Sequence, residues 1–199
     1  MSDDCWMLPN ANRSDGGKGP QVPDPSKFPS NLTLPELIQY AHAKRLKFGL
    51  YTARASTTCQ RMAGSCNHEQ VDAKQFAEWK LDYLKDDSCG RCRASNDTFD
   101  GNLADYRAMQ SALDATGRKI VLSIEGGPNI SAVSAGGAGN LRRVGTDIKE
   151  TWYSMIGLVD TGSGLWPFAH NATSSAGDGG GFWNDLDVSA ALLALLVNL

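Results

Sequence analysis

The chain has 199 residues, of which 41% are hydrophobic and 21% charged, and its formal net charge is -3. That length and composition suffice for one globular core, and the near balance of charges excludes the strongly basic surface typical of nucleic-acid-binding proteins. No basic start followed by an apolar run opens the sequence, so no signal peptide is visible. The apolar C-terminal stretch AALLALLVNL is too short to span a bilayer and predicts a buried helix.

Taken in chain order, the predicted elements alternate between helix and strand. Helices are expected over 34–46, 71–80, 102–117 and 147–160, with a final helix after 185. A buried strand is expected over 47–52, further strands over 81–87, 119–125 and 141–145, and a strand end at 182–185. The Gly-, Pro- and Ser-rich stretches 8–32, 126–140 and 161–181 are predicted to be loops.

This alternation is typical of the α/β class, with a parallel sheet and helical crossovers. A doubly wound sheet and a barrel both fit it, but no G-x-G-x-x-G follows a strand, which disfavours dinucleotide binding. Polar residues end nearly every predicted strand, and in a (β/α)₈ barrel such ends converge on one face, where the active site lies. These residues are Asp3, Asp4, Tyr51, Asp87, Glu125, Asp147 and Asp185.

Carboxylates gathered at the ends of parallel strands suit two kinds of chemistry. One is the binding of a hard metal ion through oxygen ligands, and the other is sugar hydrolysis by a carboxylate pair. The histidines favour the second, because His42 lies on a predicted helix face and His68 follows a cysteine in a loop. For each of them, and for His170, a structural role is the expectation. A metal-dependent barrel enzyme stays open as an alternative.

The order of several motifs resembles that of glycoside hydrolase family 27, the α-galactosidase or melibiase family. The motifs are DDCW (3–6), KFGLYT (47–52), TC (58–59), DAKQFAEWKLDYLKDDSC (72–89), SIE (123–125), RVGTDI (143–148) and WNDLD (183–187). The resemblance covers nearly the whole chain and implies that 1–199 is a partial (β/α)₈ TIM-barrel catalytic domain. Approximately strands two to seven are expected, without the first and last strands and the C-terminal β-sandwich.

The resemblance also implies roles for individual residues. Asp87, in Y-L-K-D-D-S-C, corresponds to the nucleophile, and Asp147, in R-x-x-x-D, to the acid/base. It implies a disulfide between Cys59 and Cys89, and no metal or cofactor. The implied sugar contacts are Asp3, Asp4, Tyr51, Lys85, Glu125, Arg143 and Asp187.

Simple physical chemistry agrees with these roles. Lys85 lies two residues before Asp87 on a strand, so both side chains point to one face, where the ammonium favours an ionised nucleophile. Asp147 must instead hold a proton, and a retaining mechanism requires the two carboxyl groups about 5–5.5 Å apart. Asp147 has a second interpretation as a helix N-cap, with Glu150 completing a capping box, and both roles can hold together.

The expected function is therefore that of a retaining α-galactosidase acting on terminal α-D-galactose of oligosaccharides, galactolipids or galactomannans. Glu125 favours galactose, whose 2-hydroxyl it would meet. The alternatives are an α-N-acetylgalactosaminidase and an inactive sugar-binding remnant. The remnant is motivated by TARA (52–55) in place of the family's SDAG, which puts Arg54 near the site, and by WNDLD in place of WNDPD. Asp86 replaces the usual aromatic residue. The expected partner is an α-galactoside, with a homodimer for the full-length parent.

Five cysteines and five N-x-[ST] sequons lean toward a secreted or lysosomal/vacuolar protein whose natural N-terminus precedes this chain. The sequons are at Asn12, Asn31, Asn96, Asn129 and Asn171. Cys66 and Cys92 are a hypothetical second disulfide, and the resemblance places the partner of Cys5 upstream. An unclosed barrel exposes two sheet edges, so a chain of this extent is expected to be poorly stable alone.

Overall fold

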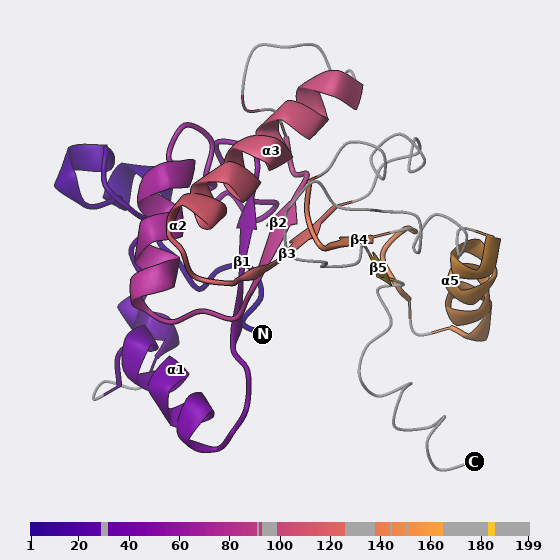
Figure 1. Cartoon of the computed structure of the whole chain (residues 1–199), viewed down its shortest axis with the longest axis horizontal. Helices are drawn as coiled ribbons and strands as arrows, with labels where there is room; N and C mark the ends of the chain where they lie inside the picture. The colour runs from indigo at the N-terminus through magenta and orange to yellow at the C-terminus, as the bar shows by residue number, and fades with distance from the viewer. Residues whose placement is uncertain are drawn as a thin grey trace. The chain divides into compact units, whose positions relative to one another are not determined.

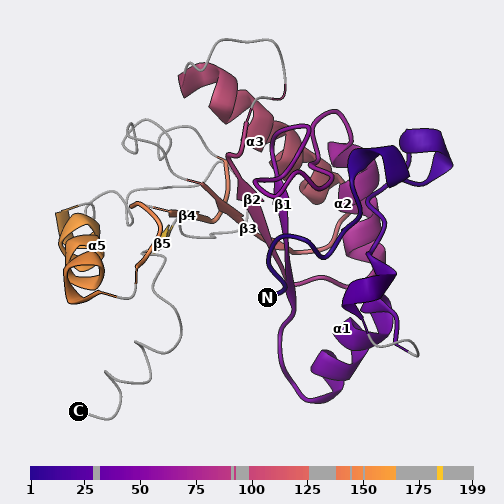
Figure 2. The same cartoon turned by 180° about the vertical axis from the view of Figure 1, so that it is seen from behind.

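The computed structural model describes residues 1–28, 32–90, 92, 99–125, 138–143, 145–149, 151–164 and 183–185. The chain divides into two compact units, an N-terminal unit (Met1–Ser123) and a C-terminal unit (Ile124–Leu199). Figures 1 and 2 show the elements of each unit from two sides. Among the described residues no helix is both long enough and apolar enough to cross a membrane.

The N-terminal unit contains the predicted helices and parallel strands up to residue 124. In chain order they are α1 (Leu34–Ala43), β1 (Gly49–Ala53), α2 (Glu69–Glu78), β2 (Tyr83–Asp87), α3 (Phe99–Ala115) and β3 (Val121–Ile124), whose last residue begins the next unit. The strands lie in the order β1-β2-β3, and β1 pairs with β2 in parallel. The α/β class expected from the sequence is thus confirmed.

Helix α1 begins at its predicted residue, whereas α2 and α3 begin two and three residues earlier than predicted. Thr33 caps α1 through a capping box, in which its backbone N–H donates to the Glu36 carboxylate over 2.7 Å. All five residues of β1 are buried, as expected for a strand covered on both faces. Helices α2 and α3 lie side by side (Figure 1). Their inward residues pack with the strands in a core that includes Leu50, Phe76, Leu84, Met109, Leu113 and Leu122.

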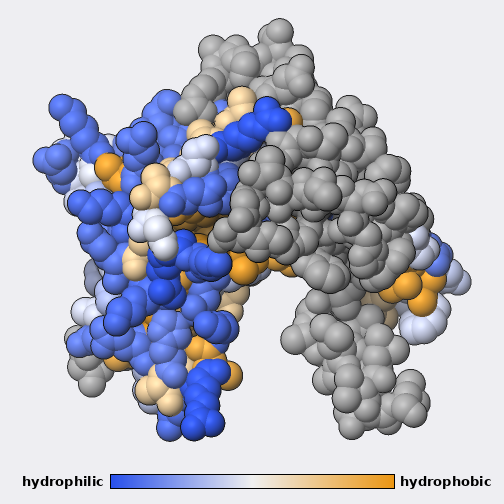
Figure 3. Space-filling view, viewed as in Figure 1, coloured by the Kyte–Doolittle hydropathy of each residue, from blue (hydrophilic) through white to orange (hydrophobic). Residues whose placement is uncertain are grey.

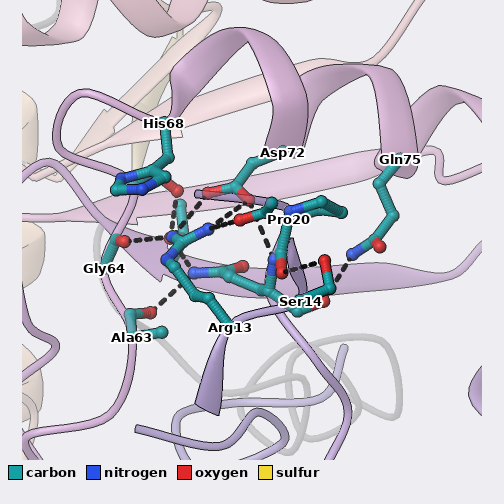
Figure 4. A network of polar contacts seen from close by, with 12 residues as sticks. Arg13, Ser14, Pro20, Ala63, Gly64, His68, Asp72 and Gln75 are labelled. Atoms are coloured by element: carbon teal, nitrogen blue, oxygen red, sulfur yellow. Dashed lines mark hydrogen bonds and ion pairs between the residues drawn. The ribbon is translucent and has the colours of Figure 1, made fainter. Parts of the chain in front are cut away.

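The predicted loop 8–32 is tightly attached to this core over its described part. It contains three short 3₁₀ turns, at Asn10–Asn12, Asp15–Gly17 and Pro25–Lys27. Arg13 anchors the loop by a two-pronged ion pair with Asp72 of α2, at 2.8 and 2.9 Å, and donates to the Gly19 carbonyl over 3.0 Å (Figure 4). Because both partners of this pair are almost fully buried, the loop belongs to the folded unit.

The C-terminal unit contributes β4 (Leu141–Arg143), α5 (Trp152–Gly164) and β5 (Trp183–Asp185). β4 and β5 pair in parallel, with Arg143 opposite Asp185. The predicted start of the loop 161–181 is wrong, because helix α5 continues to Gly164. The final helix predicted after 185, and residues 126–137 of another predicted loop, lie outside the described residues.

The expectation that Asp147 caps this helix is wrong. α5 begins at Trp152, five residues later than predicted. Thr151 performs the local capping instead, because its hydroxyl accepts from the Ser154 backbone N–H over 3.3 Å. The Ser154 hydroxyl accepts from the Lys149 N–H over 2.9 Å, and both bonds lie at the helix start, beyond Asp147.

The visible face of the N-terminal unit is mostly hydrophilic around helices α1 and α2 (Figure 3). Large apolar side chains are nevertheless exposed in both units. Tyr40 and Leu46 are exposed near the end of α1, and Trp152 and Tyr153 begin α5 with exposed rings. Single exposed apolar side chains are ordinary on a protein surface, whereas α5 also exposes Ile156 and Val159.

Candidate active site

The Asp87 carboxylate ends β2 with both of its oxygen atoms hydrogen-bonded. The Tyr51 hydroxyl donates to Oδ2 over 2.5 Å, and the Ser88 backbone N–H donates to Oδ1 over 2.6 Å. Tyr51 reaches Asp87 because the parallel register of β1 and β2 places Tyr51 beside Lys85, two residues before Asp87. Two donors from different directions fix the orientation of this carboxylate.

The surroundings keep the Tyr51 hydroxyl protonated and therefore able to donate. Burial, followed by the hydrogen bond to Asp87 and the negative charges of Asp87 and Asp4, raises the pKa of Tyr51 well above its usual range. Lys85 is buried on the same face of β2 as Asp87, as the spacing of two residues predicts.

A disulfide closes the edge of this arrangement. Cys59 and Cys89 are bonded, with their Cα atoms 4.8 Å apart, which confirms the pairing implied by the family resemblance. The Tyr51 hydroxyl also lies 3.3 Å from the Cys89 sulfur. The hypothetical pair Cys66–Cys92 is present as well, with a Cα–Cα distance of 5.1 Å. Cys5 is free among the described residues.

The N-terminal acidic pair approaches this same region through Asp4. Its carboxylate accepts from the Gln60 backbone N–H over 3.0 Å, next to the disulfide at Cys59. Asp3 is exposed, and its carboxylate accepts from the neighbouring Asp4 N–H over 2.8 Å. The structure therefore gathers Asp4, Tyr51 and Asp87 around the end of the β1–β2 pair.

The other predicted residues form a separate cluster within the C-terminal unit. The buried Arg143 guanidinium lies 3.2 Å from the Glu125 carboxylate and also forms an ion pair with Asp147. The Asp147 side chain is 88% exposed, so it projects into solvent while Arg143 holds one of its oxygens. Asp187 lies outside the described residues.

The described residues offer little to a metal ion at the Asp87 end. Cys59, Asp87 and Cys89 have potential ligand atoms within 4.8 Å of one another. Both sulfurs are engaged in the disulfide, however, and a metal binds the thiolate form of cysteine. This leaves a single carboxylate as an effective ligand in that group.

The role of two residues beside Asp87 was not predictable from the sequence. Asp86 is fully buried, and neither of its carboxylate oxygens has a hydrogen-bond partner among the described residues. Burial raises the pKa of Asp86 well above its usual range, against the opposing charge of Arg54. Arg54 was expected near the site, but nothing in the local sequence indicated its ion pair with Asp105, 51 residues away.

Comparison with known proteins gives a consistent set of matches. The Alpha galactosidase A family model matches residues 1–192. Over 94% of its length the chain is 37% identical to an alpha-galactosidase of Oryza sativa subsp. japonica, covering 40% of that protein. It is 34% identical to an alpha-N-acetylgalactosaminidase of Rattus norvegicus, again over 94% of the chain and 42% of the relative.

Solved structures agree with these sequence matches. Alpha-galactosidase I from Mortierella vinacea superposes with a TM-score of 0.77 at 26% identity, covering 93% of this chain and 48% of that one. The alpha-galactosidase of Saccharomyces cerevisiae gives a TM-score of 0.74 at 25% identity, covering 93% and 42%. The fold is thus that of part of a TIM-barrel catalytic domain, and the chain spans about two fifths of the curated relatives it matches.

Proposed function

The chain belongs to the Alpha galactosidase A family, and we propose that it carries the catalytic residues of a retaining glycosidase that removes terminal α-D-galactose. The observation that supports this best is the Asp87 carboxylate, held by the Tyr51 hydroxyl and the Ser88 N–H at the end of β2. The whole reaction is proposed for a longer polypeptide containing this chain, because the relatives are more than twice its length.

In the first step, an Asp87 oxygen attacks the anomeric carbon of the galactoside. The bond from that carbon to the leaving oxygen breaks, and Asp147 gives its proton to the leaving oxygen, so that a galactosyl–Asp87 ester and a free alcohol form. Holding the carboxylate in one orientation matters because a preoriented nucleophile removes much of the entropic barrier to attack.

In the second step, the ionised Asp147 takes a proton from water, and the resulting hydroxide attacks the anomeric carbon. The ester to Asp87 breaks and α-galactose leaves with the configuration it had in the substrate. Arg143 forms an ion pair with Asp147 and so holds one of its oxygens during this step.

For substrate choice we propose galactose over N-acetylgalactosamine. Glu125, paired with Arg143 at 3.2 Å, would accept a hydrogen bond from the 2-hydroxyl of galactose, where an acetamido group requires more room. The rat relative, an alpha-N-acetylgalactosaminidase, supports the alternative. Hydrolysis of p-nitrophenyl α-galactoside, and not of the N-acetylgalactosaminide, is the expected result. The reverse preference would reject the proposal.

The nucleophile is tested by Asp87→Asn in the chain and in the longer polypeptide. Hydrolysis should fall by several orders of magnitude, because the amide cannot form the ester intermediate. Asp114→Asn, at an exposed position on α3, is the matched control and should keep the wild-type rate. If Asp87→Asn keeps its activity, Asp87 is not the nucleophile. A wild type that binds galactose by calorimetry but hydrolyses nothing is an inactive remnant.

We also propose that the protein works in a secreted or lysosomal/vacuolar compartment. Two disulfides fit an oxidising environment, and the sequon residue Asn12 is exposed. Treatment with an N-glycosidase should reduce the mass of the protein isolated from its source, while an unchanged mass would remove this support.

A further inference from the structure

We infer that Arg54 is a positioning residue that holds Asp87 in its attacking orientation through Ser88, an inference that rests on the proposed function. Arg54 follows β1 directly, and its backbone N–H donates to the Asp87 carbonyl over 3.0 Å. It therefore continues the β1–β2 pairing by one further hydrogen bond, beyond the opposed pair Ala53 and Asp87.

The Arg54 side chain hydrogen-bonds to Ser88, the residue after the proposed nucleophile Asp87. Its Nε and Nη2 atoms both donate to the Ser88 hydroxyl, at 3.1 and 2.9 Å. Ser88 in turn donates its backbone N–H to Asp87 Oδ1 over 2.6 Å. A displacement of Ser88 would therefore move one of the two donors that orient the carboxylate.

The guanidinium is itself fixed from a third side. Nη1 lies 3.1 Å from the Asp105 carboxylate of α3 in a pair that is almost wholly buried. The guanidinium carbon lies 5.7 Å from the ring centroid of Tyr106, the next residue on α3. The planar fork of arginine can serve these partners at once, whereas a lysine ammonium is a point donor.

Asp86, the residue before Asp87, is a second buried acid in the surroundings of Arg54. Its buried carboxyl has no hydrogen-bond partner among the described residues, and the charge of Arg54 is the largest influence opposing the rise of its pKa. Because its raised pKa favours the neutral form of Asp86, the ion pair with Asp105 alone balances the charge of Arg54. Arg54, Asp86 and Asp105, all buried, are the ionisable residues of one cluster next to Asp87 and Ser88.

The kinetic test compares Arg54→Ala, Arg54→Lys and Ser88→Ala in the hydrolysing polypeptide. Arg54→Ala should lower kcat by about 100-fold, the effect of a misplaced catalytic group, with KM and galactose inhibition changed by less than about threefold. Arg54→Lys should recover only part of the rate. The loss in the double variant Arg54→Ala/Ser88→Ala should be close to that of Arg54→Ala alone, because both changes break one chain of contacts.

Arg13→Lys is the matched control, because Arg13 is an equally buried arginine paired with an aspartate and takes no part in the Asp87 contacts. It should lose stability without the selective fall in kcat. Equal kcat losses in Arg13→Lys and Arg54→Lys, or additive effects of Arg54→Ala and Ser88→Ala, would overturn the inference.

A second measurement does not depend on hydrolysis. Hydrogen exchange of the Ser88 amide in the 199-residue chain should become at least about tenfold faster in Arg54→Lys than in wild type, since its bond to Asp87 opens more often. In Arg13→Lys it should not. If the longer wild-type polypeptide is inactive but the exchange difference is present, the proposed function is rejected and the positioning role of Arg54 stands. Unchanged Ser88 exchange rejects the positioning role.

Discussion

Two arginines of the N-terminal unit, Arg13 and Arg54, are both buried and both ion-paired with an aspartate, but their surroundings differ. Arg13 binds both oxygens of Asp72, at 2.8 and 2.9 Å, and its remaining donors reach the Gly19 and Gly64 carbonyls and the Asn10 side chain. Asp72 also accepts from the Gln21 N–H over 3.0 Å. Every charge in this group has its partners, as Figure 4 shows.

The Arg54 group is less complete. Arg54 donates to one oxygen of Asp105, Oδ2. The Asp86 carboxyl has no hydrogen bond among the described residues. A fully satisfied buried pair stabilises a fold, whereas an unsatisfied buried acid costs stability. The incomplete group is in contact with Ser88 beside Asp87, whereas the contacts of Arg13 and Asp72 do not include Asp87. The unsatisfied acid thus lies next to the residue proposed as nucleophile.

The largest expected effect comes from breaking the complete group. Arg13→Ala leaves the Asp72 carboxylate buried without its cation, and should cost about 3–5 kcal/mol of unfolding free energy. Urea unfolding of the chain measures this loss. Gln75→Ala, which removes one hydrogen bond to the Gln21 carbonyl nearby, is the control and should cost far less. A loss for Arg13→Ala no larger than the control's would contradict the contrast between the two groups.

The two disulfides differ in position, because Cys89 of the Cys59–Cys89 pair directly follows Ser88. They close loops of similar length, with sequence separations of 30 and 26, so removing either should cost a similar amount, about 3 kcal/mol. Only the pair Cys59→Ala/Cys89→Ala should also lower hydrolysis per folded molecule, since Cys89 is in contact with Tyr51. Equal kinetic effects from Cys66→Ala/Cys92→Ala would show that the disulfide at Asp87 has no special role.

Asp86 is the buried acid without a hydrogen bond among the described residues. Because the folded-state pKa of Asp86 is raised, the unfolded chain loses this proton first, and the group's stabilising contribution is complete below about pH 4 and declines as pH rises. Asp86→Asn has no charge to bury and should gain about 1–3 kcal/mol near neutral pH, with little gain near pH 4. Urea unfolding across this range provides the test, and a gain independent of pH would refute the assignment.

The smallest expected effect comes from Ser88→Ala. The Arg54 fork loses a neutral hydroxyl acceptor at the edge of the cluster, which should cost only about 1 kcal/mol of stability. Chemical denaturation measures it, with Thr116→Ala, which loses a hydroxyl bond of 2.6 Å at the end of α3, as the control. A loss for Ser88→Ala comparable with that of Arg13→Ala would mean that the two groups are energetically alike.

Local patterns in the sequence were sufficient for most of the fold. Hydrophobic periodicity and capping residues predicted α1 and β2 to within a few residues, because such signals act over one or two turns of chain. The same spacing rule placed Lys85 and Asp87 on one face of a strand. Asp147 shows the limit of these patterns. Its capping box was present in the sequence, but Asp147 pairs with Arg143, and Ser154 bonds with Thr151 and Lys149 at the observed helix start.

The sequence by itself determined the alternation of helices and strands, the family and the candidate carboxylates, since these follow from local spacing and motif order. Only the tertiary structure decided what surrounds Asp87. Tyr51 lies 36 residues from it in sequence, and Arg54 meets Asp105 across 51 residues. Contacts at such separations depend on how strands and helices pack. A buried acid without hydrogen bonds among the described residues, such as Asp86, is therefore recognised only from the three-dimensional structure.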